Sequence, residues 1–451
     1  MDPRSALLDH VALTPASDIP AEAWAAARVF ILDTVGVGLA GSTAAGADEL
    51  VASAQSWGEG AIPILGRAGT YPQSTAGLLN GFFIHNLEWD AVHEPAVVHA
   101  MSVITAACLS EAAKSPAIRG QDFAAAIILG VDIASGLGVA ADSGLRFFRP
   151  ANAGTIGAAL AVARLRGLPR AHFDDVLGLA YSQVSGTMQA HVEGSITLPL
   201  QVAIGSRSAI TAVDMAEAGL SGPHDVLDGP FGYFKIVEDG GSAAAVAERL
   251  GSQWAVTQLS HKPYPSGRAS PATLEYVLRQ SREHDLRLED VAKIDGAVTP
   301  LIHRLVARPY KPGMTPAYAR LCLPYLCALA LRDGVISPDA PSDENLSDPM
   351  LADFAGRVDI KVNTITDPNA MVPQACAITL KNGEVLQGDM PHIYGAPDFP
   401  MREAAYLEKF RFAASFSHRN LSAETIGTLE TALLDIDTQD SAATIFTVLG
   451  A

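Results

Sequence analysis

Long stretches within the first 260 residues are rich in alanine, glycine and leucine, and their apolar residues do not alternate with polar ones. Examples are the runs at residues 23–41, 123–142 and 154–168. A strand with one solvated face alternates, so this pattern is typical of helices. Small side chains at this density let helices approach each other closely. The sequence therefore predicts an all-α core of tightly packed helices from about residue 20 to residue 260.

The pattern changes after about residue 265. Alternating or β-branched stretches occur at residues 357–365 and 375–390, and the second contains an Asn-Gly turn at Asn382 and Gly383, which is typical of a hairpin. Helical patterns occur among them and return after residue 400. The predicted fold is mainly α: an all-α helical domain at residues 1–265, a smaller α+β domain at 266–398, and C-terminal helices at 399–451 that pack back on the helical domain.

Composition and charge exclude several classes of partner. No apolar run reaches the ~20 residues that cross a bilayer, and the first thirty residues lack the pattern of a secretion signal. The net charge of −18 argues against nucleic acid or an anionic membrane as a partner. The four cysteines are scattered without metal-ligand spacing, which favours small core residues. We expect a cytoplasmic protein with a small-molecule ligand.

The densest group of ionisable residues lies in the stretch NGFFIHNLEWDAVHEPAVVHA at residues 80–100. It contains His85, Glu88, Asp90, His93, Glu94 and His99. If this stretch is a helix that Pro95 ends, His85 and Glu88 share one face, and His93 and His99 lie on or beside a loop. Imidazoles beside carboxylates can take up and release protons near neutral pH.

Three interpretations of this group compete. The first is general acid–base catalysis. The second is a metal site, although the spacing H-x2-E-x-D-x2-H matches no metal motif and HExxH is absent. The third is structural, with histidines that cap helices or bind core carbonyls. Three histidines beside two carboxylates in so short a stretch favour the catalytic interpretation.

Three further stretches contain possible ligands for a substrate. At residues 260–275, Lys262 and Arg268 flank a loop before a helix that begins near Pro271, with Ser270 as the expected N-cap; such a helix start can bind an anion. Arg149 and Asn152 precede another helix and offer a second carboxylate site. The polar stretch with His191 and Glu193 is interpreted as surface-exposed.

Five blocks of the sequence resemble the MmgE/PrpD family in content and order. The stretch N-G-x3-H-x-L-E-W-D-x2-H-x5-H resembles the family signature N-G-x3-H-x-L-D-F-D-D-T-H, and K-P-Y-P-S-G-R-A-S resembles K-P-Y-P-x-C-R-x-T-H. The other blocks are GLAYSQVSG, AGLSGPHDVLDGPFGYF and LPYLCALALRDGVIS. The resemblance runs from about Ile31 to Phe410.

The resemblance implies a fold, an assembly and a chemistry. It implies a large all-α domain, a smaller α+β domain, a homodimer, and a site between the domains that works without metal or cofactor. The family includes 2-methylcitrate dehydratases, cis-aconitate decarboxylases and iminodisuccinate epimerases. His99, Asp90, Lys262 and Tyr325 match family positions, and Glu88 stands where an aspartate is usual.

Other positions depart from the family pattern. The segment Thr197–Gln201 lacks the lysine and histidine of the usual T-K-x-x-H, and Arg149 stands where a histidine is usual. Gly267 and Ser270 replace the cysteine and threonine of the lysine loop. Losing a buried lysine contact costs ~2–5 kcal/mol of binding, so we expect an acid other than 2-methylcitrate.

The sequence supports the hypothesis of a dehydratase-type lyase that abstracts a proton next to a carboxylate of a small di- or tricarboxylic acid. The expected catalytic residues are His99, His93, Asp90, Glu88 and Tyr325, and the expected substrate-binding residues are Arg149, Asn152, Lys262, Arg268 and His85. The alternatives are an epimerase or isomerase of a small carboxylic acid, a metal-dependent hydrolase that uses His85, Glu88, Asp90 and His93, and a binding protein that has lost catalysis.

Overall fold

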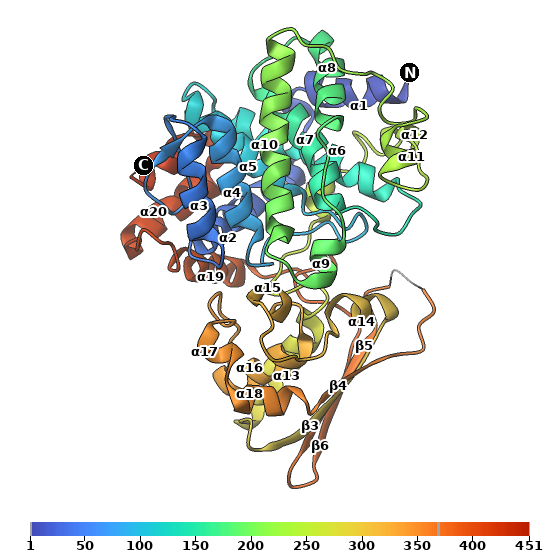
Figure 1. The fold of residues 1–451 in the computed structure, drawn as a ribbon, viewed down its shortest axis with the longest axis vertical. Coiled ribbons are helices and arrows are strands. Elements are labelled where there is room, and N and C mark those ends of the chain that lie inside the picture. The colour runs from blue at the N-terminus through green and yellow to red at the C-terminus, as the bar shows by residue number, and fades with distance from the viewer. Residues whose placement is uncertain (1, 368–369, 451) are drawn as a thin grey trace.

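The chain folds into two bodies (Figure 1), and each has its own hydrophobic core. The computed structural model describes residues 2–367 and 370–450. One core gathers side chains from residues 7–259 and 410–449, and the other gathers side chains from residues 269–393. We call the corresponding bodies the helical domain and the small domain. The mainly α fold expected from the sequence is confirmed.

Closely packed helices build the helical domain, as the density of small residues predicts. At the crossing of two of them, a Cβ on Gly157 would lie 2.5 Å from the carbonyl oxygen of Gly130, so only glycine permits this approach. A short two-stranded sheet, β1 (Ile62–Pro63) and β2 (Thr70–Tyr71), lies beside the helices. The helices are α1 (Pro3–Leu13), α2 (Ala21–Gly41), α3 (Ala47–Ala54), α4 (Gln73–His85), α5 (Ala100–Lys114), α6 (Gly120–Val139), α7 (Arg149–Leu165), α8 (Phe173–Tyr181), α9 (Gln189–Glu193), α10 (Thr197–Glu217), α11 (Tyr233–Ile236) and α12 (Ala243–Ala247).

Two of these helices are longer and more apolar than the sequence suggested. By length and composition, α2 and α6 could each cross a membrane, which corrects the expectation that no apolar run is long enough. However, 72% of the apolar window of α2 and 89% of that of α6 are buried inside the protein. Their apolar surface is covered by neighbouring helices of the same chain, as in the core helices of a globular domain.

A four-stranded sheet with helices on one side forms the small domain. The strands are ordered β4 (Val358–Val362), β3 (Val291–Val298), β5 (Gln374–Leu380) and β6 (Val385–Met390), with β3 parallel to β4 and the other pairs antiparallel. Strand β4 and the β5–β6 hairpin match the predicted strands, whereas the central strand β3 was not predicted. The helices are α13 (Pro271–His284), α14 (Pro300–Val306), α15 (Pro316–Ala319), α16 (Leu323–Asp333), α17 (Asp343–Leu346) and α18 (Pro349–Ala355).

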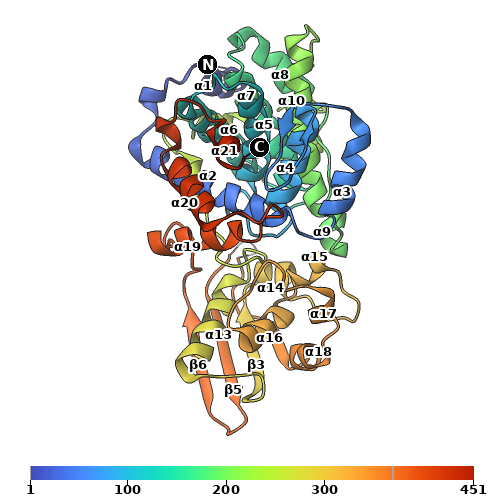
Figure 2. The ribbon, with the colours of Figure 1, turned by 90° about the vertical axis from the view of Figure 1, so that its left-hand side faces the viewer.

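The C-terminal helices return to the helical domain, as Figure 2 shows. They are α19 (Glu403–Ala414), α20 (Ala423–Leu434) and α21 (Thr444–Val448). Phe410 of α19 packs against Gly36 of α2, where a Cβ would meet the phenyl ring at 2.8 Å. At the start of α6, the amide of Gly120 donates a hydrogen bond to the carbonyl of Gln439 at 3.0 Å.

This tail contact gives a stability prediction. A Cβ at Gly120 would lie 1.6 Å from the carbonyl oxygen of Ile436, and a backbone atom cannot move aside as a side chain can. We expect Gly120→Ala to lower the free energy of unfolding by ~1–3 kcal/mol through overpacking, measured by urea denaturation. The control is Gly427→Ala in α20, where a Cβ meets nothing within 4 Å. Equal stabilities of the two variants would contradict the described packing of the tail.

Candidate active site

The backbone around the histidine cluster is a strained loop between two helices. Helix α4 ends at His85, and His99 is the residue immediately before α5. The helix therefore stops ten residues before Pro95, which corrects the expected helix over this stretch. Glu88, between the two helices, has a positive φ of 52°, a conformation that costs energy for a residue with a side chain. Such strain is often found at functional sites.

The lysine loop lies beside this segment. Val92 and Ser260 form an antiparallel bridge, in which each amide donates to the other carbonyl at 3.1 and 2.8 Å. The bridge fixes the loop that follows Ser260 against the segment that carries Glu88 and Asp90. It therefore brings Lys262 next to residues almost 175 positions earlier in the chain.

Asp90 is the centre of the cluster. Its side chain is fully buried, and its Oδ2 atom lies 2.8 Å from His85 Nδ1 and 3.0 Å from His99 Nδ1. The hydroxyl of Ser102, one turn into α5, also donates to Oδ2. The two imidazole rings meet edge to face, with centroids 4.8 Å apart. One carboxylate thus orients both histidines through the same ring nitrogen.

Glu88 and Lys262 form the second half of the cluster. The ammonium of Lys262 donates to the Glu88 carboxylate at 2.9 Å and to the Glu88 backbone carbonyl at 3.1 Å. It lies 3.8 Å from Asp90 Oδ1, and Glu88 Oε1 lies 3.7 Å from His85 Nε2. The side chain of Lys262 is only 1% exposed, so these charges interact without water between them.

The charges shift the pKa values of the cluster in different directions. Burial opposes ionisation of the Glu88 carboxyl, but Lys262, His85 and His99 outweigh it and lower its pKa to about 2. Burial also opposes ionisation of Asp90, yet the two histidines hold its pKa well below the usual value. Burial disfavours protonation of His85, but Asp90 outweighs burial and raises its pKa.

His99 behaves differently from His85. Burial lowers the pKa of His99, Lys262 and His85 add to that effect, and Asp90 only partly offsets it. His99 is therefore neutral at pH 7. Asp90 Oδ2 lies 3.0 Å from His99 Nδ1 without completing a hydrogen bond to it, and its negative charge favours the tautomer with hydrogen on Nδ1 and the lone pair on Nε2. Nε2 forms no hydrogen bond or ion pair with any residue of ranges 2–367 and 370–450, and it can accept a proton from a ligand.

A second buried ion pair holds the backbone between Glu88 and Asp90 in place. Lys409 of α19 lies 2.6 Å from Asp33 of α2 and donates to the carbonyl of Trp89 at 3.0 Å. Both charged side chains are 3% exposed. Trp89 stands between Glu88 and Asp90, so this contact fixes the backbone at the centre of the cluster.

The cluster also contains a possible donor set for a metal. His85, Asp90 and His99 offer ligand atoms that all lie within 4.8 Å of one another. Nδ1 of both histidines lies toward Asp90, and the ammonium of Lys262 lies 3.8 Å from Asp90 Oδ1. A divalent cation there would have to displace these contacts and overcome repulsion from the ammonium. The donor set therefore fits a proton-transfer site better than a metal site.

Two predicted site residues lie outside the cluster. His93 accepts a hydrogen bond from the amide of Ala96 at 3.2 Å, and its Nε2 lies 3.2 Å from the Gln258 side chain. Both ring nitrogens are thus used to fold the loop, and burial lowers the pKa of His93. Asn152 donates to the carbonyl of Phe148 at 2.9 Å at the start of α7. These contacts indicate a structural role for His93, whereas the buried Oδ1 of Asn152 has no hydrogen-bond partner and its role as a ligand stays a prediction.

The two predicted carboxylate-binding arginines are occupied by the protein itself. Arg149 forms a bidentate ion pair with buried Glu238 at 2.7 and 2.9 Å and also donates to the carbonyl of Ala96. Arg268 pairs with Glu94 at 2.7 Å and donates to three backbone carbonyls, at His261, Ile393 and Tyr394. We reassign both from substrate ligands to structural ties, because the charge of each guanidinium is paired with a carboxylate of the protein and most of its donors are used.

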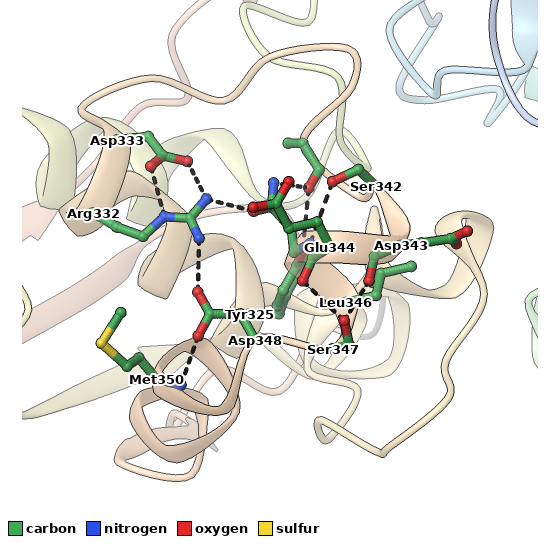
Figure 3. A network of polar contacts seen from close by, with 12 residues as sticks. Tyr325, Arg332, Asp333, Ser342, Asp343, Glu344, Leu346, Ser347, Asp348 and Met350 are labelled. Carbon is green, nitrogen blue, oxygen red and sulfur yellow. Dashed lines mark hydrogen bonds and ion pairs between the residues drawn. The ribbon is translucent and has the colours of Figure 1, made fainter.

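Tyr325 lies in the core of the small domain. Its hydroxyl donates to the carbonyl of Ala340 at 3.2 Å, and the side chain is fully buried on α16. Figure 3 shows it within a network in which Arg332 pairs with Asp333 and Asp348. Within the described residues, no hydrogen bond or ion pair joins Tyr325 to the histidine cluster. Its hydroxyl supports the packing of α16 instead of donating to a leaving group.

Three further charged or titratable residues were not predicted as ligands. Burial lowers the pKa values of Arg308 and Arg320 of the small domain and of His191 of α9, and the negative charge of Glu88 partly offsets this effect. Arg308 donates to the carbonyl of His191 at 2.6 Å, which joins the two domains. His191 is half-buried, which corrects its expected surface position. Spacing gave no signal for these residues, because the two arginines lie in the other domain.

A groove with a volume of about 1030 Å³ borders the same segment elsewhere. It is lined by Trp89 and Lys409 together with Tyr264, Tyr394 and Phe412, among others, but by none of His85, Glu88, Asp90, His99 and Lys262. The groove therefore contacts Trp89 and Lys409, which hold the backbone of the cluster, and none of its titratable side chains. The histidine cluster therefore remains the candidate active site.

Comparison with known proteins identifies the family to which this fold belongs. Residues 5–246 match the MmgE/PrpD N-terminal domain, and residues 264–433 match the MmgE/PrpD C-terminal domain. The chain belongs to the MmgE/PrpD family, as the motifs indicated.

The curated relatives are lyases, and their sequence identity to this chain is low. The cis-aconitate decarboxylase-like protein oryM of Aspergillus oryzae is 23% identical over 447 residues, covering 94% of this chain and 92% of the relative. A cis-aconitate decarboxylase of Aspergillus terreus is 22% identical over 423 residues, covering 88% and 86%. These relatives support a lyase-type function at the level of the family.

The corrected role of Arg149 gives a prediction. Arg149→Met leaves the buried carboxylate of Glu238 without its partner, so we expect a loss of ~3–5 kcal/mol of stability. The double variant Arg149→Met/Glu238→Gln should recover part of that loss in chemical denaturation. A variant Arg149→Met with unchanged stability and a raised KM would instead identify Arg149 as a substrate ligand.

Proposed function

We propose that the protein is a cofactor-independent, dehydratase-type lyase that abstracts a proton next to a carboxylate of a small di- or tricarboxylic acid. The observation that carries the proposal is the pair His99–Asp90, in which a buried carboxylate faces Nδ1 at 3.0 Å and leaves Nε2 as a free base. Family membership supports the lyase class. The departures at Thr197–Gln201 argue against 2-methylcitrate as the substrate.

In this mechanism His99 Nε2 takes the proton from the carbon next to the carboxylate. The electron pair of the C–H bond forms the C=C bond as the C–O bond breaks, and the leaving hydroxide takes a proton to become water. The imidazolium of His99 can return that proton, and Asp90 stabilises it meanwhile. Nearby cations lower the energy of the negative charge that develops on the substrate carboxylate.

Decarboxylation is the second candidate, because curated relatives are named cis-aconitate decarboxylases. There the C–C bond to a carboxylate breaks, carbon dioxide leaves, and the electron pair of that bond takes up a proton at the carbon. Because His99 is neutral at rest, its Nε2 first has to take that proton from water before delivering it. The same residues serve both reactions. Proton NMR in deuterated buffer with citrate, cis-aconitate and malate distinguishes the reactions by their products. A dehydratase gives a product that has lost water, and a decarboxylase gives a product that has lost carbon dioxide. A third possible result is exchange of deuterium into the substrate without either loss. The last result alone would favour an epimerase.

The role of His99 is tested by substitution. We expect His99→Asn to lower kcat by at least ~100-fold, the usual contribution of a positioned base, with an unchanged circular dichroism spectrum. The matched control is His93→Asn, which removes a predicted catalytic histidine that lies outside the cluster. Retained turnover in His99→Asn, or equal losses in the two variants, would contradict the assignment.

The pH dependence follows from the sign of the His99 shift. The base works only when neutral, so activity is full above its pKa and falls as the pH drops through it. Burial and Lys262 lower this pKa below the ordinary 6.5. We therefore expect kcat/KM to be flat near pH 7 and to decline only below pH 6.5. A decline centred above pH 6.5 would point to a different base.

Elemental analysis tests the alternative hypothesis that the protein is a metal-dependent hydrolase. Because Lys262 supplies positive charge beside Glu88 and Asp90, we expect no stoichiometric zinc or manganese in the purified protein and no loss of activity after dialysis against EDTA. One equivalent of either metal, with activity that EDTA removes, would favour the hydrolase. The homodimer implied by the resemblance and the cytoplasmic location expected from the composition stay predictions.

A further inference from the structure

A serine hydroxyl shares the central carboxylate of the cluster with the two histidines. Ser102 lies in the first turn of α5, where its amide donates to the carbonyl of His99 at 3.2 Å. Its side chain is fully buried, and its hydroxyl donates to Oδ2 of Asp90, which is fully buried as well. Within the described residues, this is the only hydrogen bond of that hydroxyl. The start of α5 therefore brings His99 and the hydroxyl to the same carboxylate oxygen.

Ser102 differs in this respect from several other buried hydroxyls. Those of Thr34, Ser110 and Thr155 each donate to the carbonyl of their own helix four residues earlier. Such a carbonyl is a common partner of a serine or threonine within a helix. Ser270 stands before α13 but does not cap the helix with its side chain, contrary to the sequence prediction. Ser102 instead donates to a side chain of the cluster, so its hydroxyl acts on Asp90 and not on its own helix.

The hydroxyl takes a lone pair that His99 would otherwise use. A carboxylate oxygen offers two lone pairs to hydrogen-bond donors. On Asp90 Oδ2, His85 Nδ1 takes one at 2.8 Å and the Ser102 hydroxyl takes the other. His99 Nδ1 lies 3.0 Å from the same oxygen, yet among the described residues it completes no hydrogen bond. His99 is therefore exposed to the charge of the carboxylate without the hydrogen bond.

The missing hydrogen bond matters for the charge balance around His99. The carboxylates of Asp90 and Glu88 favour the imidazolium, whereas burial, Lys262 and His85 disfavour it, and the pKa of His99 is lowered. A completed hydrogen bond to Asp90 would favour the imidazolium further, because a charge-assisted hydrogen bond is stronger than a neutral one. The ring that has to be neutral in order to accept a proton is therefore kept neutral partly by the donor that occupies its place.

We propose that Ser102 is a positioning residue for the base. Its hydroxyl occupies the second lone pair of Asp90 Oδ2, holds that carboxylate in place, and prevents a full hydrogen bond from His99 Nδ1. Asp90 thereby orients the His99 ring without stabilising a second proton on it. The part that Ser102 plays in turnover rests on the proposed function, whereas its effect on the protonation of His99 does not.

An NMR titration of protein labelled with ¹⁵N-histidine tests the effect on His99 without requiring turnover. In Ser102→Ala the freed lone pair can accept from His99 Nδ1. We therefore expect the titration midpoint of His99 to rise by roughly one pH unit, since a hydrogen bond to a charged group changes an equilibrium about tenfold or more. Comparison with His99→Asn assigns the signal. Ser102→Thr keeps the hydroxyl and should restore the original midpoint.

The matched control is Ser110→Ala, which removes another buried hydroxyl from the same helix. Ser110 donates to the carbonyl of Ala106 at 3.1 Å, so its loss should leave the His99 midpoint unchanged. If Ser102→Ala does not fold, Ser102→Cys replaces it. Because a thiol is only a weak donor, Ser102→Cys should raise the midpoint in the same direction by a smaller amount.

The outcomes separate this inference from the proposed function. If the protein is the proposed lyase, the acid limb of kcat/KM in Ser102→Ala should move to higher pH together with the NMR midpoint, and Ser102→Thr should reverse both changes. A raised midpoint without turnover of any acid would support the positioning role and refute the lyase. An unchanged or lowered midpoint in the folded Ser102 variants, or equal shifts in Ser102→Ala and Ser110→Ala, would overturn the positioning role. A loss of thermal stability in Ser102→Ala with an unchanged midpoint would show that the hydroxyl only satisfies the buried carboxylate.

Discussion

The contact between Asp90 and the two histidines is the interaction on which the rest of the site depends. A fully buried carboxylate faces Nδ1 of His85 and Nδ1 of His99, at 2.8 and 3.0 Å. A buried negative charge is stable only with partners of this kind. The negative charge of Asp90 also favours the His99 tautomer with hydrogen on Nδ1, so the same carboxylate contributes to the stability of the cluster and to its chemistry.

Buried charges extend this arrangement into both domains. Lys262 approaches Asp90 and Glu88 from the connecting loop, and Lys409 reaches from the C-terminal helix α19 to Asp33 and the carbonyl of Trp89. Each ammonium is neutralised by carboxylates of the protein. The charges of both lysines are therefore used within the protein.

The sequence predicted the elements that local pattern determines. Runs of small residues indicated the packed helices, and the turn at Asn382 and Gly383 indicated the β5–β6 hairpin. The central strand β3 was missed, because Lys293, Asp295 and Gly296 interrupt its apolar pattern.

For the site, the sequence motifs indicated five functional residues that the structure brings together: His85, Glu88, Asp90, His99 and Lys262. The arginines could not be predicted, because their roles depend on distant partners. Arg149 is neutralised by Glu238, which lies 89 positions away and has no recognisable motif. Residue spacing in the sequence can reveal a local cluster. Whether an arginine is paired within the protein or free to bind a ligand depends on contacts that only the folded chain makes.

The most direct test of this account is the protonation state of His99 in the resting protein. Two-bond proton–nitrogen NMR of protein labelled with ¹⁵N-histidine reports which ring nitrogen carries hydrogen, and comparison with His99→Asn assigns the signal. We predict a neutral ring at pH 7, with hydrogen on Nδ1 and none on Nε2. Hydrogen on Nε2 of a neutral ring, or an imidazolium at that pH, would contradict the claim that Asp90 prepares His99 as the base.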